Sequence, residues 1–431
     1  MPESTKSAPI SGDLSIRAAQ ACVLDKIAPL GTEDIAIERA LGRVLAAPIY
    51  ANRDLPPYDV SAMDGYAVRA EDVSTAPSTL RMIDDIQAGD MPRKPISAGQ
   101  CARIMTGAPV PPGADTVVRV EETRVLADGS IEIALPVKAA TDIRVRGENI
   151  RTGDVALPGD TEISPGALGV LATAKAARIE VYRLPRVAIL ANGNELEALT
   201  APFDAEKIPD ANSYALMAQV QAQGIEPVRL GIARDEPDAL AKYLRRGLEF
   251  DVLLVSGGTS VGVHDHVRPT LAALGVALHF YRVQMRPGHP VAFGTTGRGI
   301  VFCLPGNPVS SMVCFEQFVL PALRALGGHR TLFRRTVTAR LTQPARSRPG
   351  RVEFVRVTLA RSECGDYAAT PLGKQSSGDL LAMARADGLL VVPAASRGLA
   401  AGESARVQLL ETGAFQESAG LGENTDLGEN A

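Results

Sequence analysis

The sequence is poor in aromatic residues and contains no tryptophan. Aromatic residues make up 4% of the 431 residues, which is too few for base-stacking platforms or aromatic cages. Lys and Arg number 45 against 49 Asp and Glu, giving a formal net charge of −4, so there is no global positive field to attract nucleic acid or an anionic membrane. We therefore expect no nucleic-acid function, and any anionic ligand must be bound by local groups.

Paired cysteines and long apolar runs are also missing. The five cysteines form no CxxC pair and have no zinc-like spacing relative to the five histidines, which disfavours disulfides and a structural zinc site. No stretch of about 18 consecutive apolar residues occurs, and the first residues lack a basic region followed by an apolar run. The expected location is the cytoplasm, without a membrane span.

The length and the hydrophobic pattern predict a multidomain protein of α/β and β parts. At about 100–200 residues per domain, a chain of this length holds about two to four domains. The Ala-rich stretch after Ser164-Pro165 and the amphipathic pattern over 13–28 both predict helices. The parts are an N-terminal helical or linker region (14–45 with 151–183), an inserted β-rich domain (46–150), an α/β domain (184–330), a C-terminal β-barrel-like domain (335–411) and a disordered tail (412–431).

Glycine-bearing loops follow three strand-like runs of the α/β part. These runs alternate with helical stretches, which predicts a parallel sheet covered on both faces, with ligands at the carboxyl ends of its strands. Backbone N–H groups of such loops, and a helix N-terminus, can face an anion. We therefore predict a phosphate site, with ligand-free tight turns as the alternative. Its residues are Ser256, Gly257, Gly258, Ser260, Gly262, Pro305, Gly306 and Asn307.

Charged residues accompany these loops. Glu195, Asp235 and Asp265 are candidates to bind Mg²⁺, although helix caps are an equally ordinary use of such acids. Arg286 and His289, across a Pro-Gly turn, form either an anion clamp or a plain hairpin turn. Nine arginines between 330 and 361 make either a solvated strand face or the border of an anionic cleft.

Two loops of the β-rich part carry groups that suit catalysis or simple turns. Asp64 lies in SAMDGYA, and Thr106 lies in MTGAP. The sequence contains no Ser-His-Asp order, HExxH, GxxxxGK[ST] or GxGxxG, so hydrolase-triad, zinc-protease, P-loop and dinucleotide functions lack support.

An ordered series of motifs across about 14–411 resembles the molybdopterin molybdenumtransferase family, of the MoeA and gephyrin E-domain type. A single SGGxSxG would suggest only a molybdopterin-binding α/β domain, whereas the whole series is specific. The motifs are SAMDGYAV, IMTGAPVPPGADTVV, NIRTGDVALPGD, IPDANSYAL, DVLLVSGGTSVG, PGHPVAFG, LPGNPVSSMV and QSSGDLLAMARADGLLVVP.

The resemblance implies an elongated homodimer with a cleft between subunits. Such proteins take adenylylated molybdopterin and molybdate, hydrolyse the adenylate with Mg²⁺ and insert Mo into the dithiolene. Transient contacts with the molybdopterin adenylyltransferase and with client molybdoenzymes are also implied. The family positions matched here are Asp64, Thr106, Glu195, Asp235 and Asp265 as catalytic residues, the last three as Mg²⁺ ligands, and Arg351 and Ser377 as oxyanion-binding residues.

Several positions depart from the family pattern. Asn149 and Asn194 replace acids, and Arg286 and His289 replace lysines. An amide lacks the charge of a hard-metal ligand, and an imidazole with an unperturbed pKa of about 6.5 is largely neutral at pH 7. Two other functions therefore stay open, a non-catalytic carrier or assembly scaffold for the cofactor and, less favoured because of the extra β domains, the adenylyltransferase step. Molybdate and tungstate are not distinguished by these residues.

Overall fold

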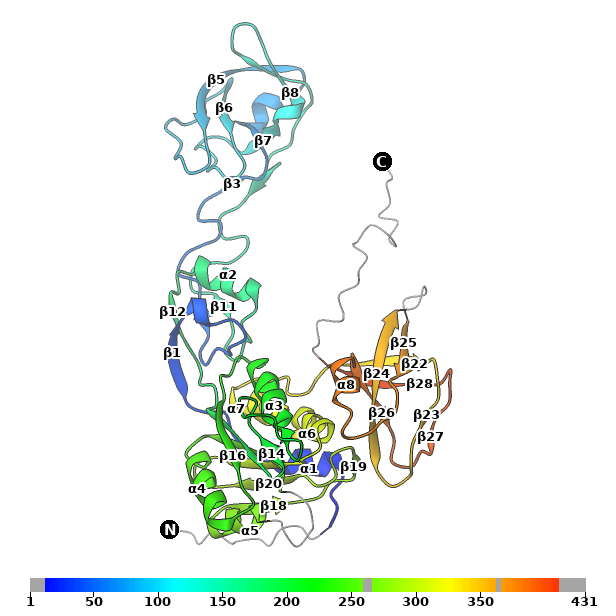
Figure 1. Cartoon of the computed structure of the whole chain (residues 1–431). Helices are drawn as coiled ribbons and strands as arrows, with labels where there is room; N and C mark the ends of the chain where they lie inside the picture. Colours follow the sequence, from blue (N-terminus) through cyan, green and yellow to red (C-terminus); the bar gives the residue numbers. More distant parts are fainter. Residues whose placement is uncertain (1–11, 259–265, 362–365, 411–431) are drawn as a thin grey trace. The chain divides into compact units, whose positions relative to one another are not determined.

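A computed structural model describes residues 12–258, 266–361 and 366–410. The predicted residues Ser260, Gly262 and Asp265 and the tail 412–431 lie outside the described residues. The chain divides into two compact units, of which the larger comprises residues up to Glu33, Gly42–Val44 and the chain from Tyr182 onward, and the smaller comprises Asp34–Leu41 and Leu45–Val181. Figure 1 labels many of the elements of both units.

The larger unit contains a six-stranded sheet in the order β16-β13-β17-β21-β20-β18. Four of its strands, β16, β13, β17 and β21, run parallel to one another. Strand β20 pairs antiparallel with β21, and β18 pairs antiparallel with β20 at the edge of the sheet. The parallel arrangement predicted from the apolar runs is therefore confirmed. The strands are β13 (Val187–Asn192), β16 (Val228–Ala233), β17 (Val252–Ser256), β18 (Ala277–Phe280), β20 (Ala292–Thr295) and β21 (Ile300–Leu304).

Helices cover both faces of this sheet (Figure 1). Helices α1, α3, α6 and α7 bury their apolar residues in one core, and α4 and α5 bury theirs in the other. Strands β13, β17 and β21 are buried along their whole length because both faces are covered. The helices are α1 (Ile16–Asp25), α3 (Ala211–Gln221), α4 (Pro237–Gly247), α5 (Val267–Ala273), α6 (Pro308–Cys314) and α7 (Leu320–Leu326), with the π-helical turn η4 (Phe315–Val319) between the last two.

Local sequence signals explain where these helices begin. Ser15 caps α1, its Oγ accepting from Ala18 N at 3.2 Å. Pro237 and Pro308 occupy first-turn positions, where the missing N–H costs nothing. The continuous helical segment Pro308–Leu326 is long and apolar enough to cross a membrane, but 83% of its apolar window is buried inside the structure, as in the core helix of a folded domain.

The C-terminal strands close into a five-stranded barrel, in the order β24-β25-β22-β28-β26 with β26 pairing back to β24. A separate short strand, β19 (Met285–Arg286), pairs with β24 and joins the barrel to the α/β part. Helix α8 (Leu380–Ala384) follows the loop after β25. The barrel strands are β22 (Thr336–Leu341), β24 (Val352–Arg361), β25 (Tyr367–Pro371), β26 (Gly388–Val392) and β28 (Ser404–Leu409).

The smaller unit is built mainly of β-strands. A six-stranded sheet has the order β7-β4-β6-β5-β9-β8, and two short strand pairs, β10-β3 and β11-β2, accompany it. Leu157 of β11 packs in one core with Ala167 and Leu171 of helix α2 (Pro165–Thr173), which Ser164 caps. The sheet strands are β4 (Gly65–Val68), β5 (Ser78–Ile86), β6 (Gln100–Ile104), β7 (Thr116–Arg119), β8 (Thr123–Val125) and β9 (Ile131–Ile133), and the paired strands are β2 (Ile49–Tyr50), β3 (Val60–Ser61), β10 (Ile143–Arg144) and β11 (Val155–Leu157). The remaining short strands of the chain are β1 (Thr32–Ala36), β12 (Arg178–Tyr182), β14 (Leu196–Glu197), β15 (Ile208–Pro209), β23 (Ala345–Arg346) and β27 (Gly398–Leu399).

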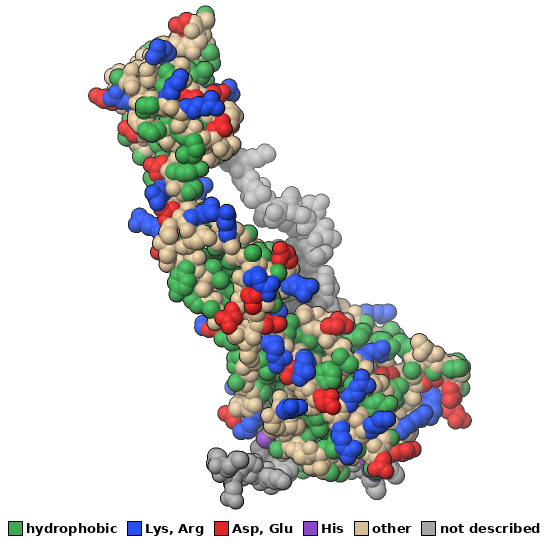
Figure 2. All heavy atoms as spheres, turned by 90° about the vertical axis from the view of Figure 1, so that its left-hand side faces the viewer, with side chains coloured by type: hydrophobic (Ala, Val, Ile, Leu, Met, Phe, Trp, Pro, Cys, Tyr) green, Lys and Arg blue, Asp and Glu red, His purple; other side chains and the backbone are tan. Residues whose placement is uncertain are grey.

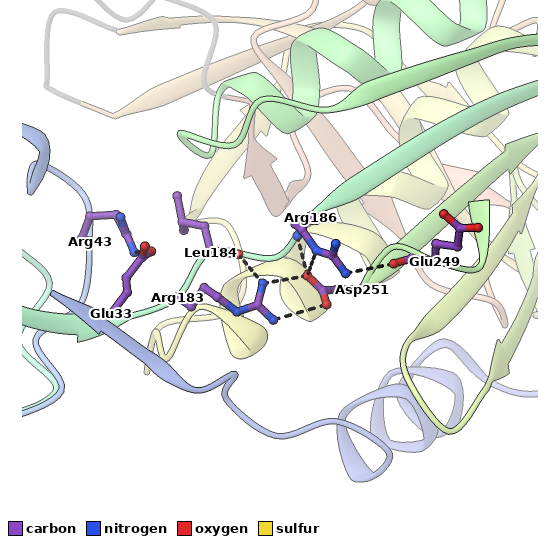
Figure 3. A network of polar contacts seen from close by, with 7 residues as sticks. All are labelled: Glu33, Arg43, Arg183, Leu184, Arg186, Glu249 and Asp251. Atoms are coloured by element: carbon purple, nitrogen blue, oxygen red, sulfur yellow. Dashed lines mark hydrogen bonds and ion pairs between the residues drawn. The ribbon is translucent and has the colours of Figure 1, made fainter. Parts of the chain in front are cut away.

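A buried carboxylate fixes the chain where it enters the α/β sheet (Figure 3). Asp251 precedes β17 and accepts hydrogen bonds from Arg183 Nη1 at 2.8 Å and from the Arg186 backbone N at 2.7 Å. Burial alone would raise the pKa of Asp251, but these hydrogen bonds and the nearby guanidinium charges outweigh burial and lower it. On the face shown in Figure 2, Lys and Arg lie interspersed with Asp and Glu, in keeping with the small net charge.

Candidate functional site

A cleft of about 680 Å³ opens at the carboxyl ends of the parallel strands. All three glycine-bearing loops predicted from the sequence contribute to it, through 192–195, 256–258 and 305–308. The structure therefore brings together Glu195, Asp235, Ser256, Gly257, Gly258, Pro305, Gly306 and Asn307 in one lining. Arg286 and His289 do not line the cleft. Of the segment 286–290, only Pro290 is in contact with it.

One glycine of the cleft is required by close backbone approach, and a second lies against a side chain. Gly257 has φ +93°, and a Cβ built on it would lie 2.2 Å from the carbonyl oxygen of Asn192. That contact joins the ends of β17 and β13, which pair along their length. A Cβ on Gly193 would instead meet the Glu195 carboxylate, 2.5 Å from Oε2. The Glu195 side chain therefore lies over the glycine of its own loop.

The Asp235 loop is held by two asparagines. Asn192 Nδ2 donates to Asp235 Oδ1 at 2.6 Å, and Asn194 Oδ1 accepts from the Asp235 backbone N at 3.1 Å. Lys207 Nζ donates to the Asn194 carbonyl oxygen at 2.7 Å. An aspartate at position 194 could accept the same hydrogen bond from Asp235 N. Asn194 accepts it without placing a second negative charge beside Asp235.

The lining is acidic. It contains Glu195, Asp210 and Asp235, and among the described residues it contains no Lys, Arg or His. Asp210 is occupied as the N-cap of α3, its Oδ1 accepting from Ser213 N at 3.0 Å. Glu195 and Asp235 are therefore the acids left to meet a ligand, and an anion cannot bind beside them unless a cation offsets their charge.

The donor set fits a hard divalent cation. Asn192 is 3% exposed, and its Oδ1 is buried without a hydrogen-bond partner among the described residues. An orphan amide oxygen in the same lining as the carboxylates of Glu195 and Asp235 is the oxygen chemistry that Mg²⁺ takes. No group of three or more His, Cys, Asp or Glu is found in the parts of the chain that the structure describes. The third predicted ligand, Asp265, lies outside them.

The basic residues of the Pro-Gly-His stretch have acidic partners. His289 Nε2 lies 2.7 Å from Asp13 Oδ2, and Arg286 Nη1 lies 3.6 Å from Glu353 Oε2. The register of β19 on β24 places Arg286 directly opposite Glu353. The predicted anion clamp is therefore engaged with carboxylates in this structure.

The loop after β25 links the barrel to the rim of the cleft. The Ser377 carbonyl accepts from Val309 N at 3.1 Å, in the first turn of α6. Arg356 is 1% exposed and its Nη2 donates to the Ser376 carbonyl at 3.0 Å, so a buried guanidinium supports this loop. Burial lowers the pKa of Arg356. Arg351 lies at the start of the same barrel strand, directly before Val352.

In the smaller unit, Asp64 and Thr106 meet across 42 residues of sequence. Asp64 Oδ1 accepts from both the backbone N and the Oγ1 of Thr106, at 2.7 and 2.8 Å. These two bonds lower the pKa of Asp64, the backbone bond contributing most. The carboxylate is thus kept ionised, with Oδ2 making no hydrogen bond to the residues that the structure describes.

Two asparagines of the cleft, Asn192 and Asn212, were not among the predicted site residues. Asn192 opens the first glycine-bearing loop and Asn212 lies in a helical stretch, and an asparagine at either place is not by itself a signal of function. Their partners are 43 to 94 residues away. The only available signal was that IPDANSYAL belongs to the ordered motif series.

Family models match nearly all of the described chain. They are the MoeA N-terminal region (domains I and II) over 14–174, the probable molybdopterin binding domain over 188–325 and the MoeA C-terminal region (domain IV) over 338–410. A molybdopterin molybdenumtransferase of Staphylococcus aureus (strain Mu50) is 32% identical over 388 residues, 89% of this chain and 92% of that protein. The chain belongs to the MoeA, or molybdopterin molybdenumtransferase, family.

Further relatives support this assignment. A molybdopterin molybdenumtransferase of Nostoc sp. (strain PCC 7120) is 40% identical over 305 residues, 69% of this chain and 70% of that protein. The crystal structure of a molybdopterin biosynthesis MoeA protein from Pyrococcus horikoshii OT3 has a TM-score of 0.80 at 29% identity, and covers 93% of this chain and 100% of that chain. The expected MoeA-type architecture, with a molybdopterin-binding domain and a C-terminal barrel, is thereby confirmed.

Proposed function

We propose that the chain inserts molybdenum from molybdate into adenylylated molybdopterin in molybdenum cofactor biosynthesis, with hydrolysis of the adenylate and release of AMP. Membership of the MoeA family supports the substrate class. The observation that carries the chemistry is the cleft itself, in which Gly-bearing loops at the ends of β13, β17 and β21 surround Glu195 and Asp235. Such loops present backbone N–H groups to phosphate oxygens.

The charge of the cleft supports a requirement for Mg²⁺. A phosphoanhydride is anionic, and the described lining offers carboxylates without a basic side chain. Glu195, Asp235 and the amide oxygen of Asn192 would hold the ion, with Asp265 as a further proposed ligand. When bound, Mg²⁺ supplies positive charge that offsets these carboxylates and polarises the phosphoryl oxygens.

The remaining roles follow from the donors present. Gly257, Gly258 and Gly306 would let the backbone approach the phosphates, and Ser256 would donate a hydroxyl hydrogen bond. Ser377 and Arg351 would bind the oxyanion substrate, and Asp64, held ionised by Thr106, would accept a proton or orient water. A homodimer with the active cleft between subunits is part of this proposal.

The test is AMP release and Mo incorporation by the purified chain, mixed with adenylylated molybdopterin, molybdate and Mg²⁺. We expect AMP release that depends on both molybdate and Mg²⁺, with loss of AMP release on chelation by EDTA. Glu195→Gln should reduce turnover by at least about a hundredfold, since it removes charge at the proposed metal. Tight binding of adenylylated molybdopterin without AMP release would refute the insertase and leave a cofactor carrier.

The departures from the family pattern are tested separately. Restoring Asn149→Asp, Asn194→Asp and His289→Lys one at a time should raise turnover if these residues limit the reaction. Asn194 already makes the positioning bond to Asp235 N, so Asn194→Asp should change turnover least. A large rise from that variant alone would show that its charge, rather than its hydrogen bond, matters.

A further inference from the structure

One side-chain amide joins two of the three loops of the cleft. Asn212 lies in the first turn of α3, and its Nδ2 donates to Ser256 Oγ at 2.8 Å and to the Gly306 carbonyl oxygen at 2.7 Å. Ser256 ends β17, and Gly306 follows β21. Because all three residues line the cleft, Asn212 fixes the distance between the two predicted phosphate-binding loops.

The orientation of this amide is determined by its partners. A carbonyl oxygen only accepts hydrogen bonds, so the group that faces Gly306 must be the NH₂ of Asn212. The opposite orientation would place two acceptors 2.7 Å apart. This orientation leaves the amide oxygen Asn212 Oδ1 buried without a hydrogen-bond partner among the described residues, which costs free energy.

This bond determines what Ser256 can offer to a ligand. The Ser256 side chain is almost fully buried, at 2% exposure, and its bond with Asn212 is its only side-chain hydrogen bond within the described residues. A hydroxyl has one donor hydrogen. Since its oxygen already accepts from Asn212, that hydrogen is directed away from the amide and remains available at the cleft.

We propose that Asn212 is a positioning residue that directs the Ser256 hydroxyl hydrogen into the cleft, so that Ser256 donates a hydrogen bond to a phosphate oxygen of the substrate. Phosphate oxygens at neutral pH are acceptors, so a hydroxyl hydrogen oriented in this way matches them. This inference rests on the proposed function, because it assigns the specificity of the same phosphate site.

The experiment measures binding of inorganic pyrophosphate with Mg²⁺ by calorimetry. Asn212→Leu keeps the approximate volume but removes both donors, and Ser256→Ala removes the hydroxyl. Each should raise the Kd at least about tenfold, the effect of losing one hydrogen bond to a charged group. The Kd of the double variant should not exceed that of the single variant with the higher Kd, because both changes remove the same hydrogen bond to the ligand. Gln221→Leu, at the exposed end of the same helix, is the matched control and should bind like wild type.

A pH series separates donor loss from distortion of the loops. In Asn212→Asp the introduced carboxylate has no donor at about pH 8 and recovers an O–H when protonated at acidic pH. The ratio of its Kd to that of wild type should therefore fall as the pH approaches about 4, the ordinary range of an aspartate pKa, whereas the ratio for Asn212→Leu should stay constant. A purely structural role of the amide predicts the same flat ratio for both variants.

The outcomes are distinguishable. If wild type does not bind pyrophosphate at all, the phosphate site of the proposed function is wrong. If wild type binds but Asn212→Leu binds equally well, or the losses from Asn212→Leu and Ser256→Ala multiply in the double variant, the inference about Asn212 is wrong. Should Asn212→Leu fail to fold, as thermal unfolding would reveal, the pH series on Asn212→Asp decides alone.

Discussion

Replacing Gly193 by alanine should move the Glu195 carboxylate while leaving the fold intact. The new Cβ would lie 2.5 Å from Oε2, 2.7 Å from Oε1 and 2.8 Å from Cδ of Glu195. Ordinary contact distance requires the carboxylate to retreat by about 0.5–1 Å, and a flexible side chain does this at low cost. The backbone at Gly193 is not in the left-handed region, so alanine adds no strain there. A displacement of about 1 Å at a catalytic group costs roughly a hundredfold in rate.

The assay is molybdate-dependent AMP release at saturating Mg²⁺, together with the midpoint of thermal unfolding. We expect Gly193→Ala to lose about two orders of magnitude in kcat, with a midpoint within about 2 °C of wild type. Gly297→Ala is the matched control, because a Cβ there meets nothing within 4 Å, and both quantities should stay unchanged. Full activity of Gly193→Ala would refute the role of Glu195, since its carboxylate cannot remain in place.

Two further predictions concern carboxylates outside the cleft. Asp251→Asn should destabilise the larger unit by about 1–2 kcal/mol at pH 7, because it weakens the bonds from Arg183 and Arg186. Since the folded-state pKa of Asp251 is lowered, its contribution is present above the unfolded pKa of about 3.9 and lost as pH falls through the folded value. The difference in denaturation midpoint between wild type and variant should therefore shrink below about pH 4, and a constant difference would contradict the argument. Thr106→Val removes one of the two bonds that lower the pKa of Asp64, so the acid limb of the rate profile should move to higher pH, and an unmoved limb would dissociate Asp64 from catalysis.

The parts of the fold that the sequence predicts are those whose signal is local. The runs RVAILA, VRLGIA, DVLLVS and IVFCL became β13, β16, β17 and β21, because strands buried on both faces read as continuous apolar segments. Ser164 marked a helix start correctly, and the amphipathic pattern over 13–28 contains α1, which Ser15 caps. The antiparallel strands β18 and β20 carry no such signal, since each is only four residues long and is defined by its pairing with a neighbouring strand.

The same distinction applies to the site. Glycine-bearing loops at strand ends are visible in the sequence, and the rule that carboxyl ends of parallel strands share one edge brings them together. The contact between Asp64 and Thr106 was not predicted, although both residues were singled out as loop groups and as matched family positions. The amide contacts of Asn192 and Asn212 depend on tertiary packing, because asparagine in a strand end or a helix is otherwise unremarkable in composition.

The charges around the cleft form a consistent pattern. The two basic residues that the sequence offered as an anion clamp each face an acid, Arg286 toward Glu353 and His289 toward Asp13. The charge of Arg286 is therefore offset by Glu353, and the imidazole of His289 is held by Asp13, while the described lining of the cleft keeps the uncompensated acids Glu195 and Asp235. An anionic substrate bound there is repelled unless a divalent cation accompanies it. Dependence on Mg²⁺ should consequently be stronger in this chain than in a relative with free lysines at positions 286 and 289, because no side chain of the described lining can take over the role of the ion.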